Sequence, residues 1–324
     1  MKKIFTLGLL LCATVWAKAQ QDAQFSQYMF NGVYINPAYA GYKEELNLHS
    51  FYRRQWTGIK GAPQTASLAV DAIANEGNVG MAFQVASDKL GAIGSLSAYA
   101  SYAYRLRVNY DESTRLAFGV GVGVVQNSLD GALFDPVNPD DPNIPKTVER
   151  SLAPDARVGA FFSNERWYAG FSVDNLVAHY LIAKNTTSPF FPIPKPHYYL
   201  TGGMMIPLNE VVQIKPSFLL KDDRGGPTSL DLNAFVLFND RIWLGGSYRT
   251  AVKLYDKAYL QKDLAKANSI VAMADFLIGT RLRVGYAYDF AIGALSGTSG
   301  GSHEISLGFY FQKNKVRMMS QRYF

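Results

Sequence analysis

The sequence is dominated by long stretches in which large apolar residues alternate with small or polar ones. From Arg281 to Ile292, every even position carries a large apolar side chain, and every odd position is charged, glycine or alanine. A period of two places these two sets on opposite faces of one β-strand. The runs cover about ten to fourteen residues. A strand of a globular protein has about 5–6 residues, whereas a tilted transmembrane strand needs about 9–11.

The alternation predicts an all-β fold, namely a single-domain antiparallel outer-membrane β-barrel of about fourteen strands within residues 45–312. The predicted strands are 45–54, 65–73, 78–87, 94–107, 113–127, 154–164, 166–176, 196–206, 210–221, 227–238, 240–250, 268–278, 280–291 and 302–312. Connections after the even-numbered strands are short, and those after the odd-numbered ones are mostly longer, as in outer-membrane barrels with short periplasmic turns. A secreted β-sandwich also has alternating strands, but strand length, loop pattern and aromatic content favour the barrel.

The charged face of each predicted strand must line the lumen, because an arginine on the lipid face costs about 2–4 kcal/mol at mid-membrane. We therefore expect Arg281, Arg283 and Asp289 to point inward and to pair across neighbouring strands. The odd-numbered glycines of 119–123 are expected on the same face, where they would let another segment approach the wall closely. Pro216 lies within the ninth strand, and its missing N–H predicts a bulge or a local break.

Both ends of the chain differ from the barrel region. Lys2 and Lys3 precede an apolar run over 4–16, and Ala17-Lys18-Ala19 fits a cleavage site, so residues 1–19 are predicted to be a signal peptide cleaved near Gln20. No later run approaches the length of a transmembrane helix. Residues 313–324 form a basic tail, expected in the periplasm. Because basic residues of the two ends account for the formal net charge of +6, no nucleic-acid partner is indicated.

Residues 20–44 precede the first predicted strand and have no clear period. They are rich in aromatic residues, including Phe25, Tyr28, Phe30 and Tyr39, with a turn-forming pair at Asn36-Pro37. Such a segment fits an ordered strap on the barrel floor, a plug in the lumen, or a periplasmic docking segment. The residues leave all three open.

Catalytic and metal-binding patterns are not evident. The four histidines show no His-x-x-x-His spacing, and the single cysteine lies in the predicted signal peptide, so we predict no metal, no cofactor and no enzymatic activity. His303, Glu304 and Ser306 are close in sequence, as an outer-membrane hydrolase would need. Alternation, however, places Glu304 and Ser306 inward and His303 on the other face.

The loop predicted over 176–195 carries Phe190 and Phe191 between prolines. Two aromatic rings on a proline-stiffened outer loop would suit contact with a partner protein. The same loop would equally well fold over its own lumen. Both interpretations stay open at the level of the sequence.

Six short motifs stand out at 22–31, 36–41, 52–56, 61–65, 301–305 and 322–324. They resemble motifs of the PorP/SprF family of type IX secretion system membrane proteins. The resemblance implies a non-enzymatic barrel in outer-membrane lipid that works with the type IX translocon, with periplasmic components or with the C-terminal domain of a secreted cargo protein. Some members serve secretion generally, and others serve one large adhesin, as in gliding motility. The alternative function is a passive solute channel or small-ligand transporter.

From these motifs and loops we derive a set of candidate partner-binding residues, which share aromatic character or a place in a motif. They are Phe25, Tyr28, Phe30, Asn36, Pro37, Tyr39, Arg53, Trp56, Phe190 and Phe191.

Overall fold

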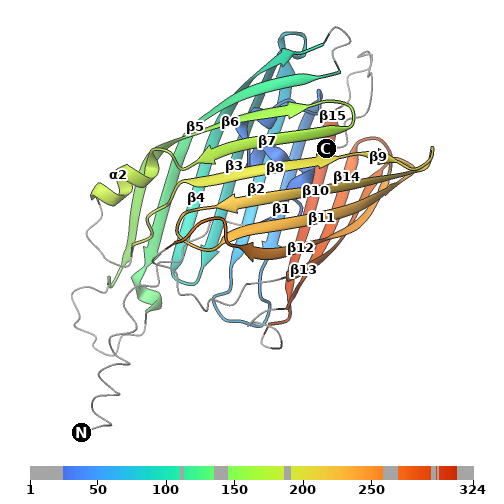
Figure 1. The fold of residues 1–324 in the computed structure, drawn as a ribbon. Helices are drawn as coiled ribbons and strands as arrows, with labels where there is room; N and C mark the ends of the chain where they lie inside the picture. The colour runs from blue at the N-terminus through green and yellow to red at the C-terminus, as the bar shows by residue number, and fades with distance from the viewer. Residues whose placement is uncertain are drawn as a thin grey trace.

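The fold is a closed antiparallel β-barrel of fourteen strands, as the sequence predicts (Figure 1). It is seen in a computed structural model that describes residues 25–109, 113–134, 145–185, 191–257, 269–292, 297 and 299–311. The predicted signal peptide and the basic tail from residue 313 lie outside the described residues. Within the described residues, no helix combines the length and apolar character that crossing a membrane requires.

The strands follow one another around the barrel in chain order. Their bounds are β1 Leu46–Arg54, β2 Gln64–Ala74, β3 Val79–Leu90, β4 Ile93–Arg107, β5 Arg115–Asp130, β6 Val148–Ser163, β7 Trp167–Asp174, β8 His197–Met204, β9 Ile206–Pro207, β10 Val212–Asp222, β11 Thr228–Phe238, β12 Ile242–Val252, β13 Ser269–Ile278, β14 Leu282–Ala291 and β15 Ser302–Phe311. The two-residue β9 continues β8 after a one-residue break, which gives fourteen strands across the wall. Pairing of β1 with β15 joins the two ends of the chain and closes the ring.

The two faces of the wall have opposite chemistry. Large apolar side chains such as Leu68, Val120 and Phe290 are about half exposed on the outer face, where lipid would cover them. Arg283 and Asp289 are buried on the inner face, so the prediction for these two is confirmed. The prediction for Arg281 is wrong, because this residue lies in the turn before β14 and is exposed.

The connections fall into two groups at opposite ends of the barrel. We call the end with connections 75–78, 108–114, 164–166, 208–211, 239–241 and 279–281 the short-turn end, and the opposite end the long-loop end. One connection at the long-loop end departs from this pattern, since only Gly91 and Ala92 join β3 to β4. The predicted loop 128–153 is too wide, because β5 continues to Asp130, paired with Val148 of β6. Residues at both ends of that loop are therefore strand.

Pro216 interrupts the ladder on one side only. Strand β10 passes through Pro216 and pairs continuously with β11. On its other side, pairing stops between Ser217, opposite Gly203, and Ile214, opposite Ile206, and it resumes in the same register. Proline has no N–H to donate to a ladder, which accounts for the local break. There is no bulge.

The N-terminal segment lies inside the barrel, behind β6, β7 and β8 in the view of Figure 1. It forms three short 3-10 turns, Tyr28–Phe30, Gly32–Tyr34 and Pro37–Tyr39. The side chains of Asn31 and Asn36 cap the second and third turns by accepting from the backbone N–H of Val33 and Ala38, and Pro37 occupies a first-turn position where its missing N–H costs nothing. We refer to residues 25–43 as the plug.

A helix that the sequence analysis does not predict, α2 (Ala178–Asn185), follows β7 at the long-loop end. Ala178 and Ile182 are one turn apart and buried, and they pack with Phe191 against the inward side chains Tyr99 and Leu129. The i, i+4 spacing of Ala178 and Ile182 is the sequence signal for this helix.

Candidate functional site

A buried charged cluster fastens the start of the plug to the barrel wall. The Arg53 guanidinium contacts the Asp289 carboxylate at 2.6 Å and the Glu304 carboxylate at 3.0 Å. Glu304 also accepts the backbone N–H groups of Ser26 (2.7 Å) and Gln27 (2.8 Å). The Ser26 hydroxyl bonds to both Asp289 and Arg53. We call Ser26, Gln27, Arg53, Asp289 and Glu304 the latch.

The strand register explains why these groups meet. Arg53 of β1 lies directly opposite Glu304 of β15. Asp289 of β14 lies on the other side of β15, opposite Ser302, which is two residues before Glu304. Alternation turns all three charges inward. Arg53 and Glu304 are at most 1% exposed. Because a buried charge is strongly destabilising without a partner, each of these groups depends on the others and on the plug backbone.

A second arginine holds the middle of the plug. The guanidinium of Arg157 donates to the carbonyls of Val33 (3.2 Å) and Tyr34 (2.9 Å), and it pairs with Asp174 at 3.1 Å. Next to it, the hydroxyl of Ser172 donates to the Ile35 carbonyl. Arg157 is completely buried.

Glycines in the wall make room for the last part of the plug. A Cβ at Gly119 would lie 2.2 Å from the backbone nitrogen of Ala38, and one at Gly80 would lie 1.8 Å from the Ala40 carbonyl oxygen. A Cβ at Gly159 would lie 2.1 Å from the side-chain oxygen of Asn36. These contacts are too short for any side chain, so the wall glycines permit the backbone of the plug to lie directly against the strands. The expectation that Gly119 allows close approach to the wall is confirmed.

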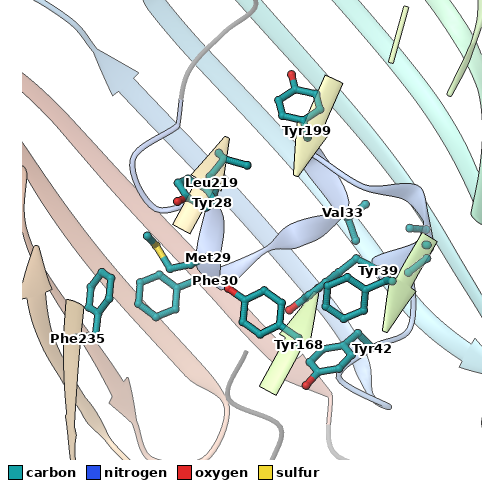
Figure 2. Close-up of a cluster of buried hydrophobic side chains, with 14 of the residues drawn as sticks. Tyr28, Met29, Phe30, Val33, Tyr39, Tyr42, Tyr168, Tyr199, Leu219 and Phe235 are labelled. Carbon is teal, nitrogen blue, oxygen red and sulfur yellow. The ribbon is translucent and has the colours of Figure 1, made fainter. Parts of the chain in front are cut away.

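Aromatic side chains fill the space between plug and wall (Figure 2). The Phe30 ring packs edge-on against Phe235 and Trp243, with centroids 5.8 and 5.9 Å apart. The Tyr39 ring makes the same type of contact with Phe161 at 5.3 Å. The Tyr28 hydroxyl accepts from the Asn233 amide at 2.7 Å, and burial raises the pKa of this phenol well above its usual value, so it stays neutral.

A small cavity remains beside the plug. Its volume is about 50 Å³, and it is bordered by Phe25, Tyr28 and Tyr199 on its apolar side. Asp231 and Arg249, which form a bidentate pair with two hydrogen bonds of 2.9 Å, border its polar side. Such a volume has room for a few water molecules.

The structure brings most of the candidate partner-binding residues together, but inside the barrel. Tyr28, Phe30, Asn36, Pro37 and Tyr39 are buried in the plug, and Arg53 is buried in the latch. Phe25 is partly buried against Tyr34 and Phe51. In this arrangement the six buried side chains hold the plug and are covered from outside partners.

The other candidates lie elsewhere. Trp56 is half-buried in the connection after β1, where its backbone N–H donates to the Ser302 hydroxyl. Phe191 is 7% exposed and packs under α2 against inward side chains of the wall, so this side chain is buried and is not displayed on the surface. Phe190 lies outside the described residues.

Sequence reasoning predicted inward positions for Asp289 and Glu304 but did not identify them as members of the site. It also missed Ser26, Gln27 and Arg157. Arg157 and Asp289 occupy inward positions of alternating strands, and this is the signal by which both could have been found. Their plug partners could not be inferred, because the plug has no period that fixes its path. Among the residues that the structure describes, no group of three His, Cys, Asp or Glu side chains is arranged to hold a metal ion.

Three of the sequence motifs converge at the latch: 22–31 supplies Ser26, 52–56 supplies Arg53, and 301–305 supplies Glu304. Residues 17–309 match the family described as type IX secretion system membrane protein PorP/SprF. The chain belongs to the PorP/SprF family. No curated protein matches its sequence. The latch is thus a meeting point of segments from both ends of the PorP/SprF match.

Solved structures similar to this PorP/SprF-family chain are membrane barrels. The CymD monoaromatic hydrocarbon channel has a TM-score of 0.54 and 11% identity, over 93% of this chain and 96% of that one. A TodX deltaS2S3 mutant monoaromatic hydrocarbon channel has a TM-score of 0.47 and 11% identity, over 88% and 94%. A Pseudomonas aeruginosa FadL homologue has a TM-score of 0.46 and 12% identity, over 89% and 94%. At these identities the likeness to CymD shows the fold alone.

Proposed function

We propose that this chain is a non-enzymatic outer-membrane barrel of the type IX secretion system that acts in the secretion or surface display of a cargo protein. It does so by binding the C-terminal domain of the cargo, components of the translocon, or both. Family membership supports the assignment to the secretion system. The structural observation that best supports a role in handling proteins is the plug, because its buried contacts fill the lumen with the chain's own polypeptide and do not leave an open pore.

In this proposal residues 1–19 direct export, cleavage occurs near Gln20, and the short-turn end faces the periplasm. The basic tail 313–324 then meets periplasmic components, and the long-loop end with Trp56 faces the cell surface. An adhesin for gliding motility is one type of cargo consistent with the family. The hydrolase alternative has no support, since Glu304 is occupied by Arg53 and two backbone N–H groups.

The alternative function is a passive solute channel or small-ligand transporter, as the name of CymD describes for that protein. The cavity beside the plug is the observation that favours this reading. Its volume of about 50 Å³ is small compared with the pockets of about 300–1,000 Å³ that hold small ligands. We expect no persistent conductance steps from the purified protein in planar bilayers. Steady open-channel currents would favour the alternative.

The test of the proposed function is affinity purification of the tagged protein from detergent extracts of its native membrane, followed by mass spectrometry. We expect translocon components or secreted proteins with a shared C-terminal domain, and we expect neither with an unrelated tagged outer-membrane barrel. Recovery of neither class with the tagged protein would refute the proposal.

A further inference from the structure

We infer that the barrel lumen is a binding site for a segment of another polypeptide, recognised in large part through its backbone, and that the plug occupies this site in cis. The inference rests on the proposed function only for the source of the incoming segment, which is a protein that the secretion system handles. The binding chemistry itself follows from contacts between plug and wall.

Side chains of the plug, such as the Asn36 amide that donates to the Ala160 carbonyl, bond to the wall, but many of the wall's hydrogen bonds go to main-chain groups, which every polypeptide has. At one end, the Glu304 carboxylate accepts two successive N–H groups, from Ser26 and Gln27. In the middle, Arg157 donates to two successive carbonyls, from Val33 and Tyr34. Charged side chains that pair with backbone groups form the stronger class of protein hydrogen bonds. This is a way to bind a chain without reading its sequence.

Further contacts continue the same mode of binding along the plug. Arg283 donates to the Phe30 carbonyl at 3.4 Å, and Ser172 donates to the Ile35 carbonyl. The backbone of residues 38–40 then lies against Gly80 and Gly119, so close that a Cβ at either glycine would clash with it. The glycines shape the wall for a bare backbone, so the main chain is recognised along the path from residue 26 to residue 40.

The plug is also built so that it can be exchanged. Backbone hydrogen bonds within the plug are local, such as those that the N–H groups of Phe30 and Asn31 donate to the carbonyls of Gln27 and Tyr28, and the plug adds no strand to the closed sheet. Two polar atoms at this interface, Asn31 Nδ2 and Asn233 Oδ1, are buried and have no protein partner among the described residues. Each such atom lowers the stability of the docked state. Because the plug contributes no strand, its release leaves the hydrogen-bond ladder of the wall intact.

Side-chain contacts add a preference to this backbone recognition. The Phe30 ring enters a site made by Phe235 and Trp243, and the Arg283 guanidinium lies over the same ring at 4.3 Å from its centroid. An incoming segment with one aromatic residue about three to four positions after its Glu304-bound N–H groups would fit the same path. A strongly charged segment would not, because burial of unpaired charge is costly.

The experiment uses the purified full chain in detergent and a fluorescein-labelled peptide with the sequence of residues 25–43, measured by fluorescence anisotropy. In the variant Phe30→Ala the resident plug is weakened while the wall is unchanged. We expect the peptide to bind this variant at least tenfold more tightly than the wild type. We also expect binding to fall at least tenfold when the peptide carries N-methyl groups at the positions of Ser26 and Gln27, which removes both donors to Glu304.

Wall variants provide the second arm. Glu304→Gln weakens the resident plug and the peptide alike, so its effect is measured as the penalty for N-methylation of the peptide. In the Phe30→Ala background this penalty should shrink at least threefold when Glu304→Gln is added, whereas it should persist with Glu165→Gln, in the exposed turn between β6 and β7. Heat-modifiable gel mobility verifies that each variant keeps its barrel. The inference is overturned if Phe30→Ala binds no peptide although its barrel is intact, or if the N-methylated peptide binds as well as the parent. Neither result depends on the secretion machinery, so failure of this inference would leave the proposed function untouched, and failure of the proposed function would leave peptide binding untouched.

Discussion

Replacement of Glu304 by glutamine is the sharpest perturbation of the plug. The change keeps the shape of the side chain but removes its charge and one of its two acceptor oxygens. Glutamine can then accept only one of the N–H groups of Ser26 and Gln27, and its amide N–H group faces other donors. Arg53 keeps Asp289 as a partner at 2.6 Å, so the loss falls mainly on the plug.

The magnitude follows from the bonds that are lost. A hydrogen bond to a charged group contributes about 1.5–3 kcal/mol, and the remaining bond weakens by about 0.5–1 kcal/mol when its acceptor becomes neutral. Docking of the plug should therefore lose about 2–4 kcal/mol. At 1.4 kcal/mol for each factor of ten, the equilibrium constant for undocking rises roughly 30- to 700-fold.

Cysteine accessibility measures this equilibrium directly. The only natural cysteine is Cys12, in the predicted signal peptide, so Val33→Cys introduces a single thiol into the mature chain. Val33 is completely buried in the plug, and a maleimide can reach a thiol at this position only when the plug leaves the wall. The labelling rate of Val33→Cys should rise by the same 30- to 700-fold factor when Glu304→Gln is added.

Glu165→Gln is the matched control, since Glu165 is exposed in a turn, and it should not change the rate. If labelling stays within twofold of the parent in Glu304→Gln while the barrel is intact, the latch does not hold the plug. That outcome would refute the assignment of Glu304.

Three further predictions concern the wall. Gly119→Val should expel the plug, because the added Cβ would lie 2.2 Å from the Ala38 nitrogen. Maleimide labelling of Val33→Cys should then become fast while the barrel keeps its heat-modifiable gel mobility, and slow labelling would contradict this prediction. Asp231→Ala should lower the free energy of unfolding by about 3–5 kcal/mol, because it leaves the buried Arg249 guanidinium without its bidentate partner. Urea titration in lipid vesicles measures this loss, and a loss under about 1 kcal/mol would contradict a stabilising Asp231–Arg249 pair. Val120→Arg, on the half-exposed outer face of β5, should cost about 2–4 kcal/mol in the same titration, and an unchanged midpoint would contradict the lipid-facing assignment.

The wall could be predicted from the sequence because a barrel strand obeys a simple rule. Residues 281–292 alternate without exception, and the same period fixed the inward positions of Arg283, Asp289 and Glu304. Strand ends were harder to predict. Residues 128–130 and 148–153 extend β5 and β6 although they carry polar residues, because backbone pairing continues to Asp130 opposite Val148 and does not depend on alternating polarity. Arg281 follows the alternation yet lies in a turn, since the period continues past the last paired residue.

The path of the plug could not be predicted from the sequence. Its turns depend on local caps by Asn31 and Asn36, whereas its position depends on contacts with residues more than a hundred positions away, such as Arg157 and Glu304. Nothing in the order of residues 25–43 specifies these partners. The motifs at 22–31, 52–56 and 301–305 carried the information, but their meeting at one latch is visible only in three dimensions.

The most direct test of the proposed role is deletion of the gene, followed by quantitative comparison of the secreted and surface proteomes with those of the parent and of a complemented strain. We predict that one or more proteins with a shared C-terminal domain disappear from the surface or the medium and accumulate in the periplasm, and that complementation restores them. Unchanged proteomes together with impaired uptake of a small solute would contradict a role in protein secretion and support the channel.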